Sequence, residues 1–349
     1  MFPRNRESRF RPPTTETSPP EPRYGIFHGD RLPMTDNCIE IVIPGIRGGA
    51  AATAEKKDPR KPDRTNQDRC VVAPHMCAVA DGVGSSAAGE LAAQTHAEEL
   101  LKQDPETDPS FQAIIDRTIE RYQADPAIDD SSGACFAACR IVDVSGEQEV
   151  KIEVTRVGDC RIIIVAPDGT KIQYHSLDES QVQYQIEKRA ITVDEGLVAF
   201  AFSNQTTRDV SKTSAGLHSL SQIDSEELLV PRGSRVIMMS DGVIGNFSNA
   251  ELIRAIAGKN SRDAIAYLDA LIDQRLVDFH TAFQAYCEKK SLKTFTQIGR
   301  NEMFMLKRQY VQDVWAQIDP VTGKPRNHFD DGFKAWPQRD DRTMIILDI

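Results

Sequence analysis

Aspartates at the ends of apolar runs are the residues of this sequence whose type and spacing could do chemistry. The run at 76–80 ends in Asp81 and the run at 236–239 ends just before Asp241, and a glycine follows each aspartate. Short apolar runs that glycine interrupts are typical of buried strands, so both carboxylates are expected at strand ends. A lone Asp-Gly pair usually marks only a turn. Its repetition after a second predicted strand favours a common site.

Further acidic positions lie beside other predicted strands. Asp68, Asp159 and the pair Asp340-Asp341 each come just before an apolar run. Carboxylate oxygens are the ligands that Mg²⁺ and Mn²⁺ prefer, and no cluster of His or Cys in the sequence competes with them. A turn cap is the plainer role for each aspartate taken singly. Together they are more than turns require, so the sequence indicates a divalent-cation site.

Short motifs surround these aspartates along the chain. They are Asn66-Gln67-Asp68, Ala80-Asp81-Gly82-Val83-Gly84, Ser132-Gly133, Val157-Gly158-Asp159-Cys160-Arg161, Ser240-Asp241-Gly242 and Asp340-Asp341-Arg342-Thr343. In this order and spacing the chain resembles the metal-dependent serine/threonine protein phosphatases of type 2C, over about residues 64–349. The resemblance implies an α+β fold, in which two central antiparallel β-sheets pack as a sandwich flanked by α-helices. Short strands between turns at 134–175, set among amphipathic helices, favour the same class.

The resemblance also implies a binuclear site of Mg²⁺ or Mn²⁺ at one end of the sandwich, with a weaker third ion. Asp81 would bridge the two principal ions. The other ligands implied are Asp241 and Asp340 for one ion, Asp68 and the carbonyl oxygen of Gly82 for the second, and Asp159 for the third.

The activity implied is hydrolysis of phosphoserine and phosphothreonine in proteins through a metal-bridging hydroxide, with Asp81 and Arg64 as the catalytic residues. Two close ions would lower the pKa of a water and offset the charge of the phosphoryl oxygens. Arg64 stands one residue nearer to Asp68 than the family's phosphate-binding arginine, and a solvated loop charge is the alternative. Val83 and Ser86 stand where relatives carry a histidine, so no general acid is assigned.

These departures leave a second class of function open. A catalytically weak or inactive pseudophosphatase would keep the fold and serve as a regulatory binding module. The polar segment at about 176–230 motivates this alternative as well, because the family has a flap over the active site there and this sequence lacks its expected pattern. The full set of metal carboxylates favours the enzyme.

Composition limits the partners and the location. The net charge of −10 and the pI near 5.3 argue against general nucleic-acid and membrane-surface binding. Phosphoprotein substrates are the partners that the resemblance implies. Seven cysteines without a Cys-x-x-Cys pair predict reduced core residues. Because no apolar run approaches the length of a membrane span, the expected location is the cytoplasm.

The chain is expected to divide into a tail and one domain. Residues 1–36 are rich in Pro and Arg and predict a disordered tail, followed by a phosphatase domain at 37–349. Within the domain, a first strand is predicted at 38–46 and a loop at 48–64.

An insertion is expected at about 281–338, because the family reaches its last aspartate soon after the helix predicted at 261–279. Its position makes it a candidate substrate-selecting or regulatory lobe, and an inert surface elaboration is an equal alternative. A partner protein could bind either this insertion or the tail.

Overall fold

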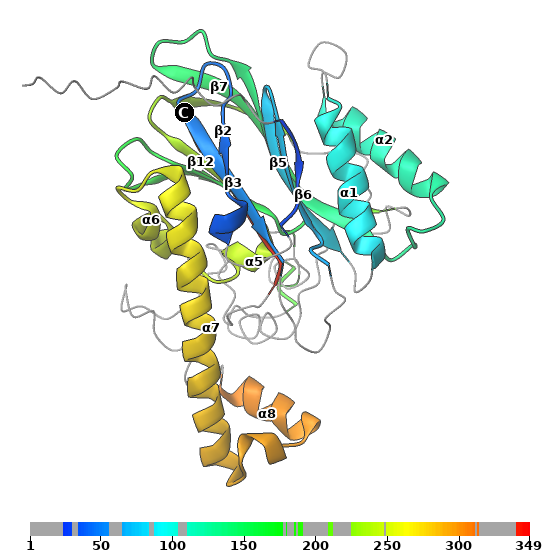
Figure 1. Cartoon of the computed structure of the whole chain (residues 1–349), viewed down its shortest axis with the longest axis vertical. Helices are drawn as coiled ribbons and strands as arrows, with labels where there is room; N and C mark the ends of the chain where they lie inside the picture. The colour runs from blue at the N-terminus through cyan, green and yellow to red at the C-terminus, as the bar shows by residue number, and fades with distance from the viewer. Residues whose placement is uncertain are drawn as a thin grey trace, which may run out of the picture.

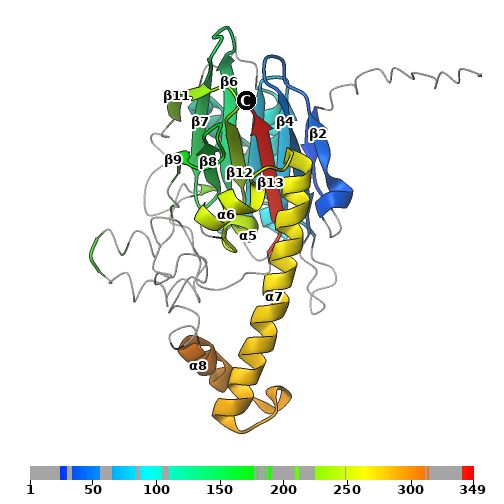
Figure 2. The ribbon, with the colours of Figure 1, turned by 90° about the vertical axis from the view of Figure 1, so that its left-hand side faces the viewer.

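Two antiparallel β-sheets pack face to face, and helices cover the outer face of each sheet (Figures 1 and 2). The predicted α+β sandwich is therefore confirmed. The computed structural model describes residues 24–29, 34–55, 65–83, 87–103, 110–176, 179, 185, 188–190, 209–211, 225–247, 249–310, 313 and 340–349.

The first sheet, sheet A, contains the strands that carry Asp68 and Asp81. Its order is β1-β4-β5-β6-β7-β11, and β10 pairs with β6. Every pair is antiparallel, so the chain returns repeatedly to the same two ends of the sheet. The strands are β1 (Gly25–Phe27), β4 (Asp68–Ala73), β5 (Met76–Val83), β6 (Gly133–Asp143), β7 (Glu149–Val157), β10 (Val210–Ser211) and β11 (Ser225–Pro231).

The second sheet, sheet B, contains the strands next to Asp159, Asp241 and Asp340. Its order is β2-β3-β13-β12-β8-β9, again with antiparallel pairs throughout. The strands are β2 (Ile39–Ile41), β3 (Gly48–Ala54), β8 (Arg161–Val165), β9 (Ile172–His175), β12 (Arg235–Met239) and β13 (Arg342–Asp348).

Three hydrophobic cores hold these layers together. One lies between the sheets, one joins sheet A to α1 and α2, and one joins sheet B to α5, α6 and α7. Each fully buried aliphatic side chain in them contributes roughly 1.5–3 kcal/mol. The helices are α1 (Ala87–Leu101), α2 (Phe111–Ala124), α5 (Asp241–Ile244), α6 (Asn249–Ile256), α7 (Ser261–Ser291) and α8 (Arg300–Tyr310), with 3₁₀ turns η1 (Met34–Asn37) and η2 (Phe295–Gln297).

The segment 48–64 does not begin as the predicted loop. Gly48–Ala54 forms β3, which lies between β2 and β13. Its sequence GGAAATA lacks the β-branched residues that usually favour strands. A Cβ on Gly49 would stand 2.4 Å from the carbonyl oxygen of Ile346, so the small residues serve close strand packing.

The predicted disordered tail extends too far toward the domain. Gly25–Phe27 forms β1, which pairs with β4 at the edge of sheet A. Met34 is fully buried, and its backbone N–H donates to Oδ2 of Asp269 at 2.8 Å. A strand of three residues is too short to show alternating apolar and polar residues in the sequence. It is recognised only by its pairing with β4. Residues 1–23 lie outside the described residues.

The predicted flap at 176–230 also ends earlier than expected. Ser225–Pro231 forms β11, an edge strand of sheet A that pairs with β7 along its whole length. The strand is mostly exposed, with Leu229 65% accessible, which explains its polar sequence. Most of the remaining flap segment lies outside the described residues.

Helix α7 is longer than predicted and extends into the segment expected as an insertion. The side chain of Asn260 caps it by accepting from the N–H of Asp263 at 2.8 Å. Its first half packs against sheet B, and from Phe279 onward it packs against η2 and α8 instead. We call residues 279–310 the lobe; it projects from one end of the sandwich (Figures 1 and 2). Among the described residues, no helix combines the length and apolar character needed to cross a bilayer.

A buried ion pair fastens α7 to sheet B. Arg342, the first residue of β13, donates through Nη1 to Asp269 at 2.5 Å and through Nη2 to Asp273 at 2.7 Å. The side chains of Arg342 and Asp269 are 3% and 2% exposed, whereas that of Asp273 is 52% exposed. One arginine therefore has a buried and a half-exposed partner on the same helix.

We predict unequal losses of stability when the two aspartates are truncated. Asp269→Ala removes the buried partner of Arg342 and of the N–H of Met34, leaving only the half-exposed Asp273 on the guanidinium, and should cost about 3–5 kcal/mol. Asp273→Ala removes an exposed partner and should cost about 1 kcal/mol or less. Urea unfolding of the two variants measures both values, and equal losses would contradict the role of the buried pair.

Candidate metal-binding site

The aspartates singled out in the sequence lie at one common end of the two sheets, which we call the acidic end. Asp68 begins β4, and Asp81 lies near the end of β5. Asp241 follows β12 and Asp340 comes before β13. Antiparallel strands alternate in direction, so the start of one and the end of its neighbour meet at the same edge.

Asp68 and Asp81 are direct cross-strand neighbours in sheet A. Their Cα atoms pair in the β4–β5 ladder, and the same residue of β5 pairs with Cys135 on β6. Side chains of directly opposed residues lie on the same face, with Cβ atoms roughly 4.5–5.5 Å apart. The two carboxylates are therefore held side by side by the register of the sheet.

Ser240 connects this pair to sheet B. Its hydroxyl donates to Oδ2 of Asp68 at 2.7 Å and accepts from the backbone N–H of Thr343 at 3.0 Å. Its own N–H donates to the carbonyl oxygen of Thr343 at 3.0 Å. One fully buried serine thus ties the strand ends of β4, β12 and β13 to one another.

Asp241 is the first residue of α5, directly after this serine. A Cβ on Gly242 would stand 1.9 Å from the carbonyl oxygen of Asp341, so only glycine allows this turn to lie against the start of β13. The glycine of the motif therefore places Asp241 beside the Asp340-Asp341 pair.

Asp159 lies where the chain crosses from one sheet to the other. β7 of sheet A ends at Val157 and β8 of sheet B begins at Arg161, so three residues make the crossing. Gly158 has a φ of +87°, a conformation that L-residues rarely adopt. The tight crossing holds Asp159 at the acidic end, where its charge acts on Asp81.

The two adjacent aspartates before β13 face different neighbours. Asp341 is buried, and its Oδ2 accepts from the backbone N–H of Gln67 at 3.0 Å. Its charge raises the pKa of Asp68, whereas the charge of Asp340 raises the pKa of Asp81. The carboxylate of Asp341 thus faces the Asn66–Asp68 turn, whereas the charge of Asp340 acts on Asp81.

Electrostatic repulsion concentrates on Asp68 and Asp81. Burial raises the pKa of Asp68 well above its usual value, and Asp341 and Asp241 raise it further. Burial and then the charges of Asp68 and Asp241 raise the pKa of Asp81 in the same direction. A divalent cation would relieve this repulsion, because it favours the charged form of each carboxylate.

The donor set fits hard divalent cations. Its members are carboxylate and carbonyl oxygens, the ligands of Mg²⁺ and Mn²⁺. The nearby thiols of Cys135 and Cys160 are buried, and burial raises the pKa of both, which keeps them protonated. Within the described ranges, no three acidic, His or Cys side chains already form a metal-binding group, so the fit rests on chemistry and charge.

Arg69 supports the Asp68 turn in a way that the sequence did not indicate. Its Nη1 donates to the carbonyl oxygens of Asn66 and Asp68 at 2.7 and 2.8 Å. Its Nε and Nη2 donate to Gln94 and Glu90 of α1 at 2.7 and 2.9 Å. The guanidinium therefore fastens the turn to a covering helix, while Asp68 faces the other way.

A further carboxylate at the acidic end was also missed. Asp209 precedes β10, whose residues pair with Gly133 and Ala134 at the start of β6. Its Oδ2 would stand 2.9 Å from a Cβ on Gly133, and burial raises its pKa. No apolar run of useful length marks it in the sequence, because β10 has only two residues.

Not every expected site residue can be located. Arg64 and Ser86 lie outside the described residues. Gly82 is described: its N–H donates to the carbonyl oxygen of Gln67 at 3.2 Å, and a Cβ there would stand 2.4 Å from the carbonyl oxygen of Gly89. Val83 is half-buried and packs against the core between the sheets.

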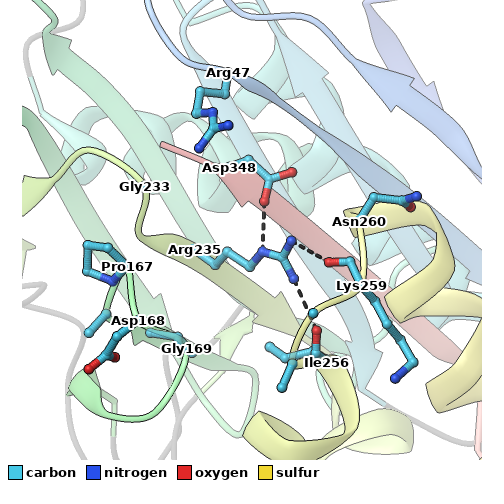
Figure 3. A pocket seen from close by; sticks show the side chains of 14 residues that line it. Arg47, Pro167, Asp168, Gly169, Gly233, Arg235, Ile256, Lys259, Asn260 and Asp348 are labelled. Carbon is cyan, nitrogen blue, oxygen red and sulfur yellow. Dashed lines mark hydrogen bonds and ion pairs between the residues drawn. The ribbon is translucent and has the colours of Figure 1, made fainter.

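A cavity of about 690 Å³ lies at the opposite end of sheet B (Figure 3). It is lined by the first residue of β12 and the last of β13, Arg235 and Asp348. Arg235 donates to Asp348 and to the carbonyl oxygens of Ile256 and Lys259, so its hydrogen bonds are used within the fold. We place the candidate site at the acidic end, because its carboxylates and their repulsion lie there.

Comparisons with known proteins agree with this geometry. The family model described as Protein phosphatase 2C matches residues 59–291. A search of curated proteins finds no match.

Solved structures of similar fold come from bacterial phosphatases. The Mycobacterium tuberculosis serine/threonine phosphatase PstP/Ppp is 16% identical, with a TM-score of 0.52 over 86% of this chain and 97% of that one. The PPM Ser-Thr phosphatase MsPP from Mycobacterium smegmatis is 17% identical, with a TM-score of 0.51 over 87% of this chain and 99% of that one. Identities this low show a shared fold, whereas the family match covers most of the sequence. The chain belongs to the protein phosphatase 2C family and is, by class, a protein-serine/threonine phosphatase.

Proposed function

We propose that this protein hydrolyses phosphoserine and phosphothreonine in proteins in a reaction that requires Mg²⁺ or Mn²⁺. The observation that carries the proposal is the meeting of Asp68, Asp81 and Asp241 at the acidic end: the charge of Asp241 raises the pKa of both other carboxyls, and the charge of Asp68 raises that of Asp81. Family membership supports phosphoproteins as the substrate class. The cytoplasm is the proposed location, supported by seven cysteines that form no disulfide.

Two cations are proposed, with Asp81 between them. Asp241 and Asp340 would hold one, Asp68 and the carbonyl oxygen of Gly82 the other, and Asp159 a weaker third. When bound, the ions would make a water acidic enough to attack phosphorus near neutral pH and would offset the charge of the phosphoryl oxygens.

The protein's own groups hold this arrangement and complete it. Ser240 and Arg69 fix Asp68 from two sides, as the hydrogen bonds above show. Arg64 is proposed to bind the phosphate. The side chain of Val83 cannot donate a proton, so we propose that water supplies the proton of the leaving group.

An aryl phosphate tests the proposal against the pseudophosphatase alternative. We expect the purified chain to hydrolyse p-nitrophenyl phosphate with millimolar Mn²⁺ and to lose this activity in EDTA. An aryl leaving group is acidic and needs little protonation, so the assay is independent of the missing histidine. A folded chain that binds Mn²⁺ without turnover would be the regulatory binding module.

We predict that Asp81→Asn and Asp241→Asn each lower Mn²⁺-dependent hydrolysis by about a thousandfold or more, because each removes a charge that holds the cations. Asp168→Asn at the opposite end of the fold is the matched control and should retain normal rates. Circular dichroism checks that all three variants stay folded. Near-normal turnover in either of the first two variants would show that the metal assignment is wrong.

A second prediction concerns the serine that orients Asp68. Ser240→Ala should raise the Mn²⁺ concentration for half-maximal activity by about tenfold, because groups that orient a metal ligand typically contribute 10–100-fold in affinity. Ser234→Ala is the control: Ser234 is equally buried, precedes the same strand at its other end and donates to Gln173 at 3.3 Å. Metal titration of hydrolysis measures both, and equal shifts would contradict a specific role.

A further inference from the structure

The lobe reaches well beyond the acidic end of the sandwich. Arg275 on α7 donates to the carbonyl oxygen of Asn246 and to Glu251, so this part of the helix lies beside α5 and α6. Ser291 ends the helix sixteen residues later, a rise of about 24 Å. Figures 1 and 2 both show α8 beside this far part of α7, beyond α5.

The lobe has a small core of its own. Ring centroids of Phe283 and Tyr310 lie 5.4 Å apart, and those of Phe279 and Tyr310 lie 5.5 Å apart. Its buried members, none of which belongs to the three main cores, are Phe279, Phe283, Cys287, Ile298, Leu306 and Tyr310. The sandwich does not require this cluster for its own packing, so the lobe is free to serve another purpose.

The charge of the lobe opposes that of the chain. Residues 281–310 contain six Lys and Arg against two Glu, a net charge of +4 in a chain of net charge −10. Three of these lysines lie in the sequence KKSLK at 289–293, which we call the basic tip. Lys290 and Lys293 remain 44% and 48% exposed despite ion pairs to Asp313 and Glu302.

Leu292 is the least expected residue of the basic tip. It is 91% exposed and has a φ of +56° at the C-cap of α7, a position where glycine is favoured. Lysines in a last helical turn are explained by the helix dipole. Because Leu292 is almost fully exposed and glycine would adopt its backbone conformation with less strain, it is the apolar side chain of the tip that is available to a partner.

We propose that the basic tip docks an acidic segment containing apolar residues on the phosphoprotein substrate, separated from the phosphorylated residue by the far part of α7. The inference rests on the proposed function, because it assigns the tip to the same substrate. Opposite charge supplies the attraction and Leu292 supplies an apolar contact. A small phosphate ester cannot span the roughly 24 Å of helix between Arg275 and Ser291, whereas about ten extended residues can.

Paired peptides test the proposal directly. One carries phosphothreonine followed, twelve residues on, by an acidic block of six Glu and two Leu; its partner has Gln in place of each Glu. We expect the acidic peptide to have a kcat/KM about tenfold higher at low salt, since a few exposed charge pairs together give about this factor. The difference should shrink at 0.5 M NaCl, where exposed charges are screened.

Matched variants assign the preference to the tip. Neutralising it with Lys289→Gln, Lys290→Gln and Lys293→Gln should abolish the tenfold preference and leave hydrolysis of p-nitrophenyl phosphate unchanged. The control makes the same change in net charge outside the lobe, at Lys102 just after α1, Lys151 on β7 and Lys171 just before β9. This control variant should keep the preference for the acidic peptide, because the preference depends on where the positive charges lie and not on net charge alone.

Leu292→Gly separates docking from stability. Glycine adopts the left-handed conformation without strain, so the melting temperature should rise by about 2 °C. The kcat/KM for the acidic peptide should nevertheless fall about threefold, while that for the Gln peptide stays the same. A structural role of Leu292 would instead lower stability and leave both peptides equal.

The possible results distinguish docking at the basic tip from the proposed phosphatase function on which it rests. Absence of aryl phosphate hydrolysis would contradict the proposed phosphatase function itself. Full hydrolysis with equal kcat/KM for the two peptides, or an equal loss of preference in the control variant, would overturn docking at the tip. Sedimentation of the wild type, but not the neutralised tip, with phosphatidylserine vesicles would assign the tip to a membrane surface and would also overturn it.

Discussion

Repulsion among carboxylates held close together at the acidic end is the constraint on which the rest of the structure depends. Desolvation and like charges each raise the pKa of Asp68 and Asp81, so a chain with mobile strand ends would separate them. The fold prevents this through backbone register. Asp68 and Asp81 are fixed by a β-ladder, and Asp241 by a turn that only glycine permits. The site is thereby prepared to receive positive charge.

Because strand residues alternate in direction, arginine side chains support the site without pointing into it. Successive residues of a strand face opposite sides, so Asp68 turns toward the acidic end while Arg69 turns toward α1. The same alternation separates Asp341 from Arg342, which turns toward α7. Each arginine binds carboxylates of the helix that covers its own sheet. The two arginines therefore anchor the strand ends and leave the acidic end free to bind metal ions.

The aspartate motifs were readable from the sequence because each joins a short apolar strand to an acidic turn. The same local rule failed for β3, whose small residues resemble a loop. They are explained only by the close approach of the Ile346 backbone to Gly49, which the sequence does not reveal. The rule also failed for Arg69, whose partners Glu90 and Gln94 lie on a helix 21 and 25 residues away. Strand ends follow from local pattern, whereas the groups that hold them follow from tertiary contacts. The metal-ligand roles remain predictions for every member of the set: Asp68, Asp81, Gly82, Asp159, Asp241 and Asp340.

The lobe differs from a surface loop because it begins inside a helix. Asp269 and Asp273 bind α7 to β13 at the acidic end, and the same helix continues to Ser291 without a break. A flexible linker would allow many separations, whereas an unbroken helix fixes one, about 1.5 Å for each residue. The lobe therefore stands at a set distance from the carboxylates. A docking surface held in this way can select substrates by the spacing between the phosphate and the docked segment as well as by charge.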